Sequence, residues 1–135
     1  MARYYLDTSI WLDYYEKRGA NGEIATKLIE KLLLNNNQIF FSDMHIIELK
    51  HLGYTIEAIK NIISIANKRK AVTKVHISGK QFEEATLIAG IRKVPRGDAL
   101  HAILCRDNEC QFVTGDKDFQ KLKDVTQSKK PEELI

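Results

Sequence analysis

The chain has 135 residues, a net charge of +3 and 44% apolar residues, which is typical of one soluble globular domain. We expect a single domain over residues 1–135, with residues 128–135 forming a flexible tail. No apolar run approaches the ~20 residues of a membrane-spanning helix, and the N-terminus lacks a signal-peptide layout. We therefore expect a cytoplasmic protein without a membrane partner. Its two cysteines are too few for a disulfide scaffold and lack paired zinc-ligand spacing.

Short apolar runs alternate along the chain with segments of helical periodicity. The aromatic and apolar run at residues 3–6 predicts a first strand. The helix after it begins near Ile10 and is broken by residues 19–22, which contain two glycines. Residues 23–34 repeat apolar positions at helical spacing and predict the next helix. Residues 39–41 predict a second strand, so the chain opens with a strand, two helices and a strand.

Helix-capping residues mark the middle of the chain. Ser42 or Asp43 caps the helix that follows the second strand. Thr55 caps another helix, whose apolar face continues as far as Ala66. Residues 72–77 alternate apolar and polar side chains and predict a third strand.

The last part of the chain repeats this order of elements. A helix is predicted over residues 78–89, and Asp98 stands at the N-cap of a helix over residues 99–105. Residues 112–114 predict a fourth strand, and Asp118 caps a short helix after it. Strands separated by helices indicate a parallel sheet with helices on both faces, and ligands of such folds bind beyond the carboxyl ends of the strands.

Four carboxylates occupy positions that this topology brings toward one edge of the sheet. Asp7 directly follows the first strand, Asp116 follows the fourth, Asp98 begins a helix, and Glu48 lies in the helix after the second strand. Taken alone, each could be a cap, a turn residue or a solvated side chain. Together they would repel one another, and the usual reason to tolerate this is a hard cation such as Mg²⁺ or Mn²⁺.

Four short segments frame these acids in chain order. They are YLDTSIW (residues 5–11), FS (41–42) with IEL (47–49) and Gly53, Pro95 with GDALHA (97–102), and FVTGDKDF (112–119). Each is unspecific by itself. Together they span nearly the whole chain and resemble the PIN-domain nucleases, and among these the VapC-like toxin ribonucleases of prokaryotes.

The resemblance implies a Rossmann-like three-layer α/β/α sandwich with a parallel sheet. It also implies a Mg²⁺- or Mn²⁺-dependent endoribonuclease that is often a homodimer. The catalytic and metal-binding acids carried over are Asp7, Glu48, Asp98 and Asp116, of which Asp7 and Asp98 would be the principal ligands. The supporting polar positions are Thr8, Ser9, Thr114 and Asp118, and of the two acids in the last segment Asp116 ranks first because it is nearer the strand end.

Several further residues lie near the predicted site. Arg92, Arg96 and Lys117 flank the acids and are candidates to hold substrate phosphates. His101 follows Asp98 by one helical turn and could approach the site, although packing or hydrogen bonding on its helix is the favoured interpretation.

The sequence thus predicts a metal-dependent ribonuclease, acting as the toxin of a toxin–antitoxin pair, with RNA as substrate and a small DNA-binding antitoxin as partner. Two alternatives stay open: a housekeeping RNA-processing PIN nuclease and a non-catalytic RNA-binding PIN module. A phosphotransferase working through an aspartyl-phosphate is disfavoured, because Asp7-Thr8-Ser9 lacks the second acid that such enzymes carry after the first strand.

Overall fold

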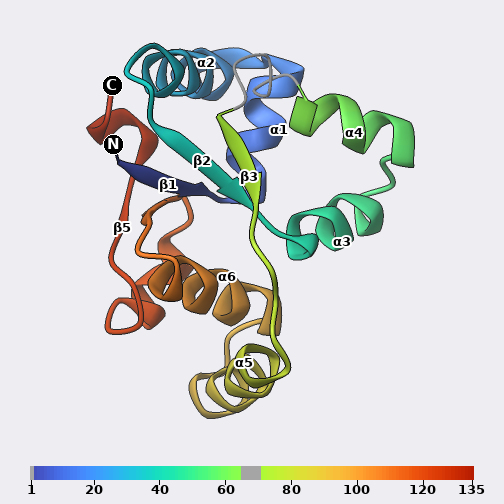
Figure 1. Cartoon of the computed structure of the whole chain (residues 1–135), viewed down its shortest axis with the longest axis vertical. Helices are drawn as coiled ribbons and strands as arrows, with labels where there is room; N and C mark the ends of the chain where they lie inside the picture. The colour runs from blue at the N-terminus through green and yellow to red at the C-terminus, as the bar shows by residue number, and fades with distance from the viewer. Residues whose placement is uncertain (1, 65–70) are drawn as a thin grey trace.

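The computed structural model of the protein describes residues 2–64 and 71–135 (Figure 1). Its elements, in chain order, are β1 (Arg3–Leu6), α1 (Thr8–Glu16), α2 (Gly19–Leu34), β2 (Gln38–Phe41), α3 (Asp43–His51), α4 (Ile56–Ser64), β3 (Val72–Lys74), α5 (Gly79–Arg92), α6 (Arg96–Asp107), β4 (Gln111–Val113), η2 (Lys117–Leu122), β5 (Ser128–Lys129) and η3 (Pro131–Glu133). The predicted continuation of the α4 helix to Ala66 lies outside the described residues.

The strands form one five-stranded sheet in the order β3-β2-β1-β4-β5, and every neighbouring pair is parallel. In the central strands, Tyr5 of β1 pairs with Phe40 of β2 on one side and with Phe112 of β4 on the other. The carboxyl ends of β1, β2 and β4 therefore meet at the same edge of the sheet. The predicted parallel α/β architecture is confirmed.

Side chains that alternate along the strands divide the core between two helical layers. Tyr5 and Phe112 are buried against α5 and α6, whereas Leu6 and Val113 are buried against α1 and α2. Figure 1 shows these two pairs of helices on opposite sides of the sheet. Because side chains at neighbouring strand positions point to opposite faces, the apolar runs in β1 and β4 supply both cores at once.

The boundary between α1 and α2 differs from the prediction. The chain reverses at Lys17, which adopts a left-handed conformation (φ 52°) and donates its N–H to the carbonyl of Asp13. The next helix already starts at Gly19, so Gly22, predicted to break a helix, lies inside α2. A left-handed residue at the end of α1 satisfies a helix-end carbonyl and turns the chain without a longer loop.

Two predicted helix caps are also wrong. Pro95 stands at the N-cap of α6, so Asp98 lies in the first turn and its carboxylate is not the cap of that helix. At the short helix η2 the cap is Asp116, which accepts a hydrogen bond from the N–H of Asp118 at 2.9 Å. The ring of Pro95 fixes its φ and has no N–H, which suits a position just before a helix.

The two outer strands differ from the prediction in length and number. The third strand covers only Val72–Lys74, because the chain leaves the sheet after Val75 donates its N–H to Phe41. Ser128 and Lys129, which we placed in a flexible tail, pair with β4 as the edge strand β5. An edge strand has one row of partners and needs no apolar side chains, so its polar sequence gave no signal.

Two further observations concern the described helices and thiols. Among the helices in residues 2–64 and 71–135, none combines the length and apolar character that a membrane crossing requires. Cys105 and Cys110 are both free.

The tight turn between α1 and α2 yields a first testable prediction. A Cβ atom added at Gly22 would lie 2.5 Å from the carbonyl carbon of Lys17, whereas one added at Gly90 in α5 would meet nothing within 4 Å. Gly22→Ala should therefore destabilise the protein by about 2 kcal/mol, although alanine favours helices. Gly90→Ala, the matched control, should stabilise it by about 0.5–1 kcal/mol. Urea unfolding of both variants checks this, and equal effects would contradict the described turn.

Candidate active site

A pocket of about 400 Å³ lies at the carboxyl edge of the sheet, and all four predicted acids line it. Asp7 directly follows β1, Glu48 projects from α3, Asp98 lies in the first turn of α6, and Asp116 stands between β4 and η2. These residues are separated by up to 109 positions in sequence and come together only through the parallel topology. The structure thus places in one pocket the four acids that the sequence singled out.

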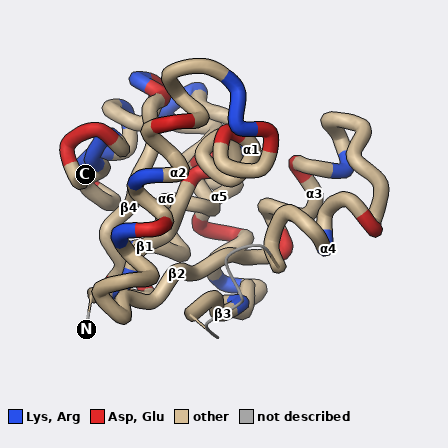
Figure 2. The backbone as a smooth tube through the Cα atoms, turned by 90° about the horizontal axis from the view of Figure 1, so that it is seen from above, with Lys and Arg blue, Asp and Glu red and all other residues tan. Residues whose placement is uncertain are grey.

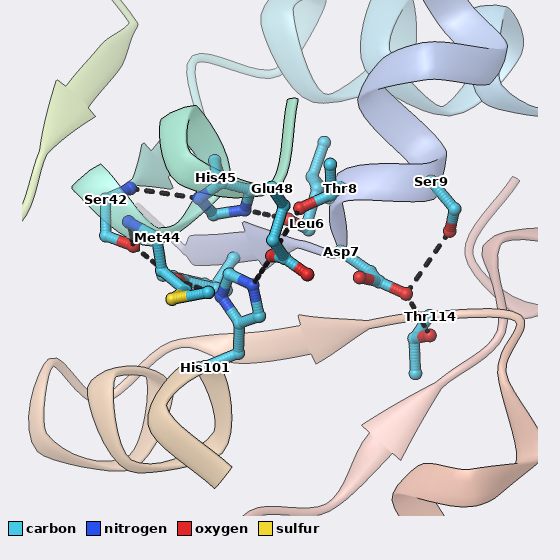
Figure 3. Close-up of polar contacts among 11 residues, drawn as sticks. Leu6, Asp7, Thr8, Ser9, Ser42, Met44, His45, Glu48, His101 and Thr114 are labelled. Carbon is cyan, nitrogen blue, oxygen red and sulfur yellow. Dashed lines mark hydrogen bonds and ion pairs between the residues drawn. The ribbon is translucent and has the colours of Figure 1, made fainter. Parts of the chain in front are cut away.

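Asp7 is buried, and one of its two carboxylate oxygens accepts hydrogen bonds from neighbouring side chains. Its backbone N–H donates to the carbonyl of Val113 at 2.9 Å, which fixes the residue against β4. Its Oδ2 accepts hydrogen bonds from Thr114 Oγ1 at 2.8 Å and Ser9 Oγ at 3.2 Å (Figure 3). Although Asp7 stands at the N-cap of α1, its side chain makes no capping hydrogen bond. The alternative in which Asp7 serves only as a helix cap is therefore wrong.

Glu48 is held in the same manner by different residues. Its Oε1 accepts hydrogen bonds from Thr8 Oγ1 at 2.9 Å and from the Nε2 of His101, whose ring is completely buried. Burial alone would raise the pKa of Glu48. The hydrogen bond from His101, together with that from the hydroxyl of Thr8, outweighs burial and lowers the pKa of this carboxyl below its usual value. Glu48 is therefore ionised near neutral pH.

Asp98 and Asp7 are shifted in the opposite direction. Burial and the negative charges of Asp7, Glu48 and Asp116 raise the pKa of Asp98 to about 6, against a smaller opposing effect of His101. Burial also raises the pKa of Asp7, with His101 and Thr114 opposing it. Ionising these carboxyls in one place is costly, so a bound cation would relieve strong repulsion.

The last segment contributes one acid to the pocket. Asp116 donates its N–H to Thr114 Oγ1 at 3.0 Å, and Thr114 in turn donates to Asp7. Thr114 therefore connects the two acids that follow β1 and β4. Asp118 is exposed and contributes its backbone N–H to the cap of η2. Of the two acids in this segment, Asp116 lines the pocket.

The three predicted phosphate-binding residues have different surroundings. The guanidinium of Arg92 is paired with Asp124, with Nη2 donating to Oδ2 at 2.7 Å. Arg96 lies 4.7 Å from the centre of the Phe82 ring, and Lys117 lines a smaller pocket of about 100 Å³ beside the acids. Figure 2 shows basic positions interleaved with acidic ones along the described chain. Arg92 thus already has an acidic partner, whereas the role of Lys117 and Arg96 stays a prediction.

The donor set defines the kind of cation that this pocket suits. Within residues 2–64 and 71–135, no three His, Cys, Asp or Glu side chains are grouped so that they could hold a metal ion on their own. The pocket instead offers hard carboxylate oxygens, the ligands that Mg²⁺ and Mn²⁺ prefer. Mg²⁺ is commonly bound through one or two carboxylates and keeps several waters. The residues present therefore fit a partly hydrated divalent cation.

Sequence reasoning missed the contact of His101 with the site. We favoured packing or a hydrogen bond along its own helix, whereas its ring reaches Glu48 on α3. Asp98 and His101 are three positions apart in α6, and such residues share one face of a helix. That spacing indicated a possible approach to the acids, but it gave no indication of the partner, Glu48 on α3.

Comparisons with known proteins agree with this geometry. A family model of the PIN domain matches residues 4–125. The fold is similar to that of VapBC2 from Rickettsia felis, solved bound to a DNA fragment from its promoter, with a TM-score of 0.64, 18% identity and coverage of 95% of this chain and 96% of that chain. It is also similar to PAE2754 from Pyrobaculum aerophilum, with a TM-score of 0.56, 18% identity and coverage of 98% and 93%. No curated protein sequence matches the chain. The match of the family model over most of the chain shows that this protein belongs to the PIN domain family.

Proposed function

We propose that this protein is a Mg²⁺- or Mn²⁺-dependent endoribonuclease that hydrolyses RNA phosphodiester bonds in the four-acid pocket. PIN domains are generally nucleases. The observation that carries the proposal is that Asp7, Glu48, Asp98 and Asp116, from four separate segments, line one pocket. Asp7 and Asp98 would be the principal ligands, and the other two acids would complete the site.

Each protein group has a defined part in this proposal. A bound divalent cation would supply an activated water and neutralise charge on the phosphate. Thr114 and Ser9 hold one oxygen of Asp7, and Thr8 holds one oxygen of Glu48, so that the remaining oxygens face the ligand. Glu48 or Asp116 would orient the attacking water.

The RNA backbone on either side of the scissile bond would be bound by basic side chains. Lys117 and Arg96 would bind the phosphates that flank the scissile bond. Hydrolysis that expels the 3′ oxygen would leave a 5′-phosphate and a 3′-hydroxyl. We omit Arg92 from this role because Asp124 already pairs with its guanidinium.

We further propose that the nuclease is the toxin of a toxin–antitoxin pair. The similar Rickettsia felis structure is a VapBC2 assembly bound to promoter DNA, and the present chain covers 96% of the matched chain. On this proposal the partner is a small DNA-binding antitoxin, the nuclease is a homodimer in the cytoplasm, and residues 1–135 form one domain. Co-expression with the neighbouring gene product and light scattering of the purified protein test the partner and the dimer.

A second testable prediction concerns the metal. The purified protein should cleave members of a mixed RNA panel with Mg²⁺ or Mn²⁺, stop in EDTA and recover when metal is added back. Asp98→Asn should lose cleavage under all conditions, whereas Asp118→Asn, an exposed acid outside the pocket lining, should keep it. Cleavage that continues in EDTA would refute the metal-dependent mechanism. Metal binding without cleavage of any RNA would favour a non-catalytic RNA-binding module.

A further inference from the structure

A buried chain of hydrogen bonds runs behind Glu48, on the side away from the pocket. Ser42 Oγ lies 2.9 Å from the hydroxyl of Tyr5, and this hydroxyl lies 2.6 Å from Nδ1 of His101. The Nε2 of His101 contacts Oε1 of Glu48. The side chains of Tyr5, Ser42 and His101 are fully buried, and Figure 3 shows His101 reaching Glu48 from α6. The chain therefore links β1, the start of α3 and α6 to one carboxylate of the pocket.

The direction of each hydrogen bond follows from the groups involved. An ionised Glu48 can only accept, so Nε2 of His101 carries the hydrogen and donates it. With Nε2 carrying the hydrogen, Nδ1 of the ring is an acceptor, and the Tyr5 hydroxyl 2.6 Å away donates to it. Ser42 then donates to Tyr5 and accepts from the backbone N–H of Met44 at 3.2 Å. Every link has one donor and one acceptor.

A second histidine fixes the orientation of the His101 ring. His45 accepts a hydrogen bond from the N–H of Ser42 at 3.0 Å and donates to the carbonyl of Leu6 at 2.7 Å. Its ring centre lies 4.6 Å from that of His101, and the centre of the Tyr5 ring lies 5.5 Å from that of His101. A buried ring that packs against these neighbours and is hydrogen-bonded at both nitrogens has little freedom to turn.

The network gives the two oxygens of Glu48 different surroundings. Oε1 accepts hydrogen bonds from two donors, Thr8 and His101. Among the described residues no hydrogen bond reaches Oε2, which lies near the start of α6: a Cβ built at Gly97 would be 4.0 Å from it. Figure 3 shows this second oxygen on the side of Asp7. Hydrogen bonds from the protein thus fix the position of Oε1 of Glu48. The second oxygen, Oε2, lies beside Asp98 and Asp7.

We propose that His101 is a positioning residue for the nuclease: with Tyr5 and Ser42 behind it, it locks Oε1 of Glu48 so that Oε2 is held ready for the divalent cation or its bound water. This inference rests on the proposed function, because it assigns a task to Glu48 within that site. The proposed role requires a hydrogen-bond donor at the position of His101 Nε2. A different side chain that places a donor there should therefore restore Mn²⁺ binding and cleavage.

The test compares variants that remove or retain that donor. His101→Leu removes it at similar volume, His101→Gln keeps an N–H at the end of the side chain, and His76→Leu changes an exposed histidine on the surface as a control. Mn²⁺ affinity is measured by electron paramagnetic resonance, and cleavage is measured as kcat and KM. His101→Leu should lower Mn²⁺ affinity and kcat by about 10- to 100-fold with little change in KM. His101→Gln should recover most of this loss, and His76→Leu should behave as wild type.

Two results would overturn the inference. A folded His101→Leu protein with wild-type Mn²⁺ affinity and kcat shows that Glu48 needs no such support. Equal losses in His101→Gln and His101→Leu show that the donor is irrelevant and that the ring matters only for packing. Circular dichroism and melting temperature establish that the variants are folded at the assay temperature.

Tyr5→Phe keeps the test decisive if His101→Leu does not fold. It removes one hydroxyl from the same chain and should lower Mn²⁺ affinity by several-fold, in the direction of His101→Leu; unchanged affinity overturns the chain behind His101. Failure of the proposed function looks different, because the wild-type protein itself would then neither bind Mn²⁺ nor cleave RNA.

Discussion

Replacing Asp7 with asparagine should reduce RNA cleavage by at least about 100-fold while leaving the protein folded. The amide oxygen of asparagine can still accept the hydrogen bonds that Thr114 and Ser9 give to Asp7. The negative charge that would hold a cation is lost. Since burial raises the pKa of Asp7, its charge is not what stabilises the fold. Single-turnover cleavage and thermal melts of the same preparation separate the two effects.

Asp13→Asn is the matched control for this experiment. Asp13 lies in α1, the helix that Asp7 precedes, but its side chain is not among those that line the acid pocket. This variant should cleave RNA as the wild type does. Wild-type cleavage by Asp7→Asn would show that the chemistry takes place elsewhere in the protein.

Replacing Asp98 with asparagine should make the metal-free protein more stable at neutral pH. The pKa of Asp98 is about 6 in the folded protein and 3.8 in its ordinary environment. As the pH rises between these values, the unfolded chain loses its proton more readily, so ionisation favours unfolding. Because Asp98 is only partly buried, solvent screens this effect, and we expect a gain of about 1–2 kcal/mol for the variant at pH 7–8.

The dependence on pH distinguishes this effect from a simple packing change. Below about pH 3 the carboxyl is protonated in both states, so Asp98→Asn should have almost no effect there. Glu48→Gln is a control of opposite sign, because its lowered pKa means that the ionised form stabilises the folded protein. Urea unfolding of both variants from about pH 3 to about pH 8 checks this pattern. A constant gain across this range for Asp98→Asn would contradict the electrostatic explanation.

Divalent metal should reverse the order of stability. A cation that binds only the folded wild type at 100 times its dissociation constant adds about 2.7 kcal/mol. The Asp98→Asn variant should gain much less from Mn²⁺, because it lacks one of the proposed ligands. A binding site that gathers like charges lowers the free energy of unfolding of the metal-free protein. Removing one of these charges should therefore raise stability while it weakens metal binding.

Local signals in the sequence located most elements of the fold. Ser42 and Ser78 both begin helices as predicted, because each side chain accepts a hydrogen bond from a backbone N–H of the first turn. The apolar run at β1 is buried on both faces and stands out from the polar segments around it. These helix starts and this strand depend on residues that are close in sequence, so they can be predicted from the sequence alone.

Features set by distant partners were not predictable in the same way. Ser128 and Lys129 form a strand only because β4 offers a free edge. The start of α2 at Gly19 depends on the left-handed turn at Lys17, and glycine by itself indicates a break as readily as a helix start.

The candidate site shows the same division. Asp7 and Asp116 could be placed because each lies in the segment after a strand, and the carboxyl ends of these two strands share an edge. The contact of His101 with Glu48 joins residues 53 positions apart on two helices, and its existence depends on how α3 and α6 approach each other. Gly97 lies where the two helices approach, since a Cβ there would lie 2.9 Å from the Met44 methyl group. Such a packing detail has no local pattern.

The order in which the acids occur along the chain affects when a ribosome could release an active enzyme. Asp7 and Glu48 emerge early during synthesis, whereas Asp98 and Asp116 belong to the last third of the chain. The strand β4, which leads into Asp116, is inserted beside β1 inside the sheet and is covered in turn by β5. A nascent chain that ends before β4 has neither the complete pocket nor the complete sheet. Translation itself therefore delays completion of the four-acid pocket until β4 and the segment that carries Asp116 have been made.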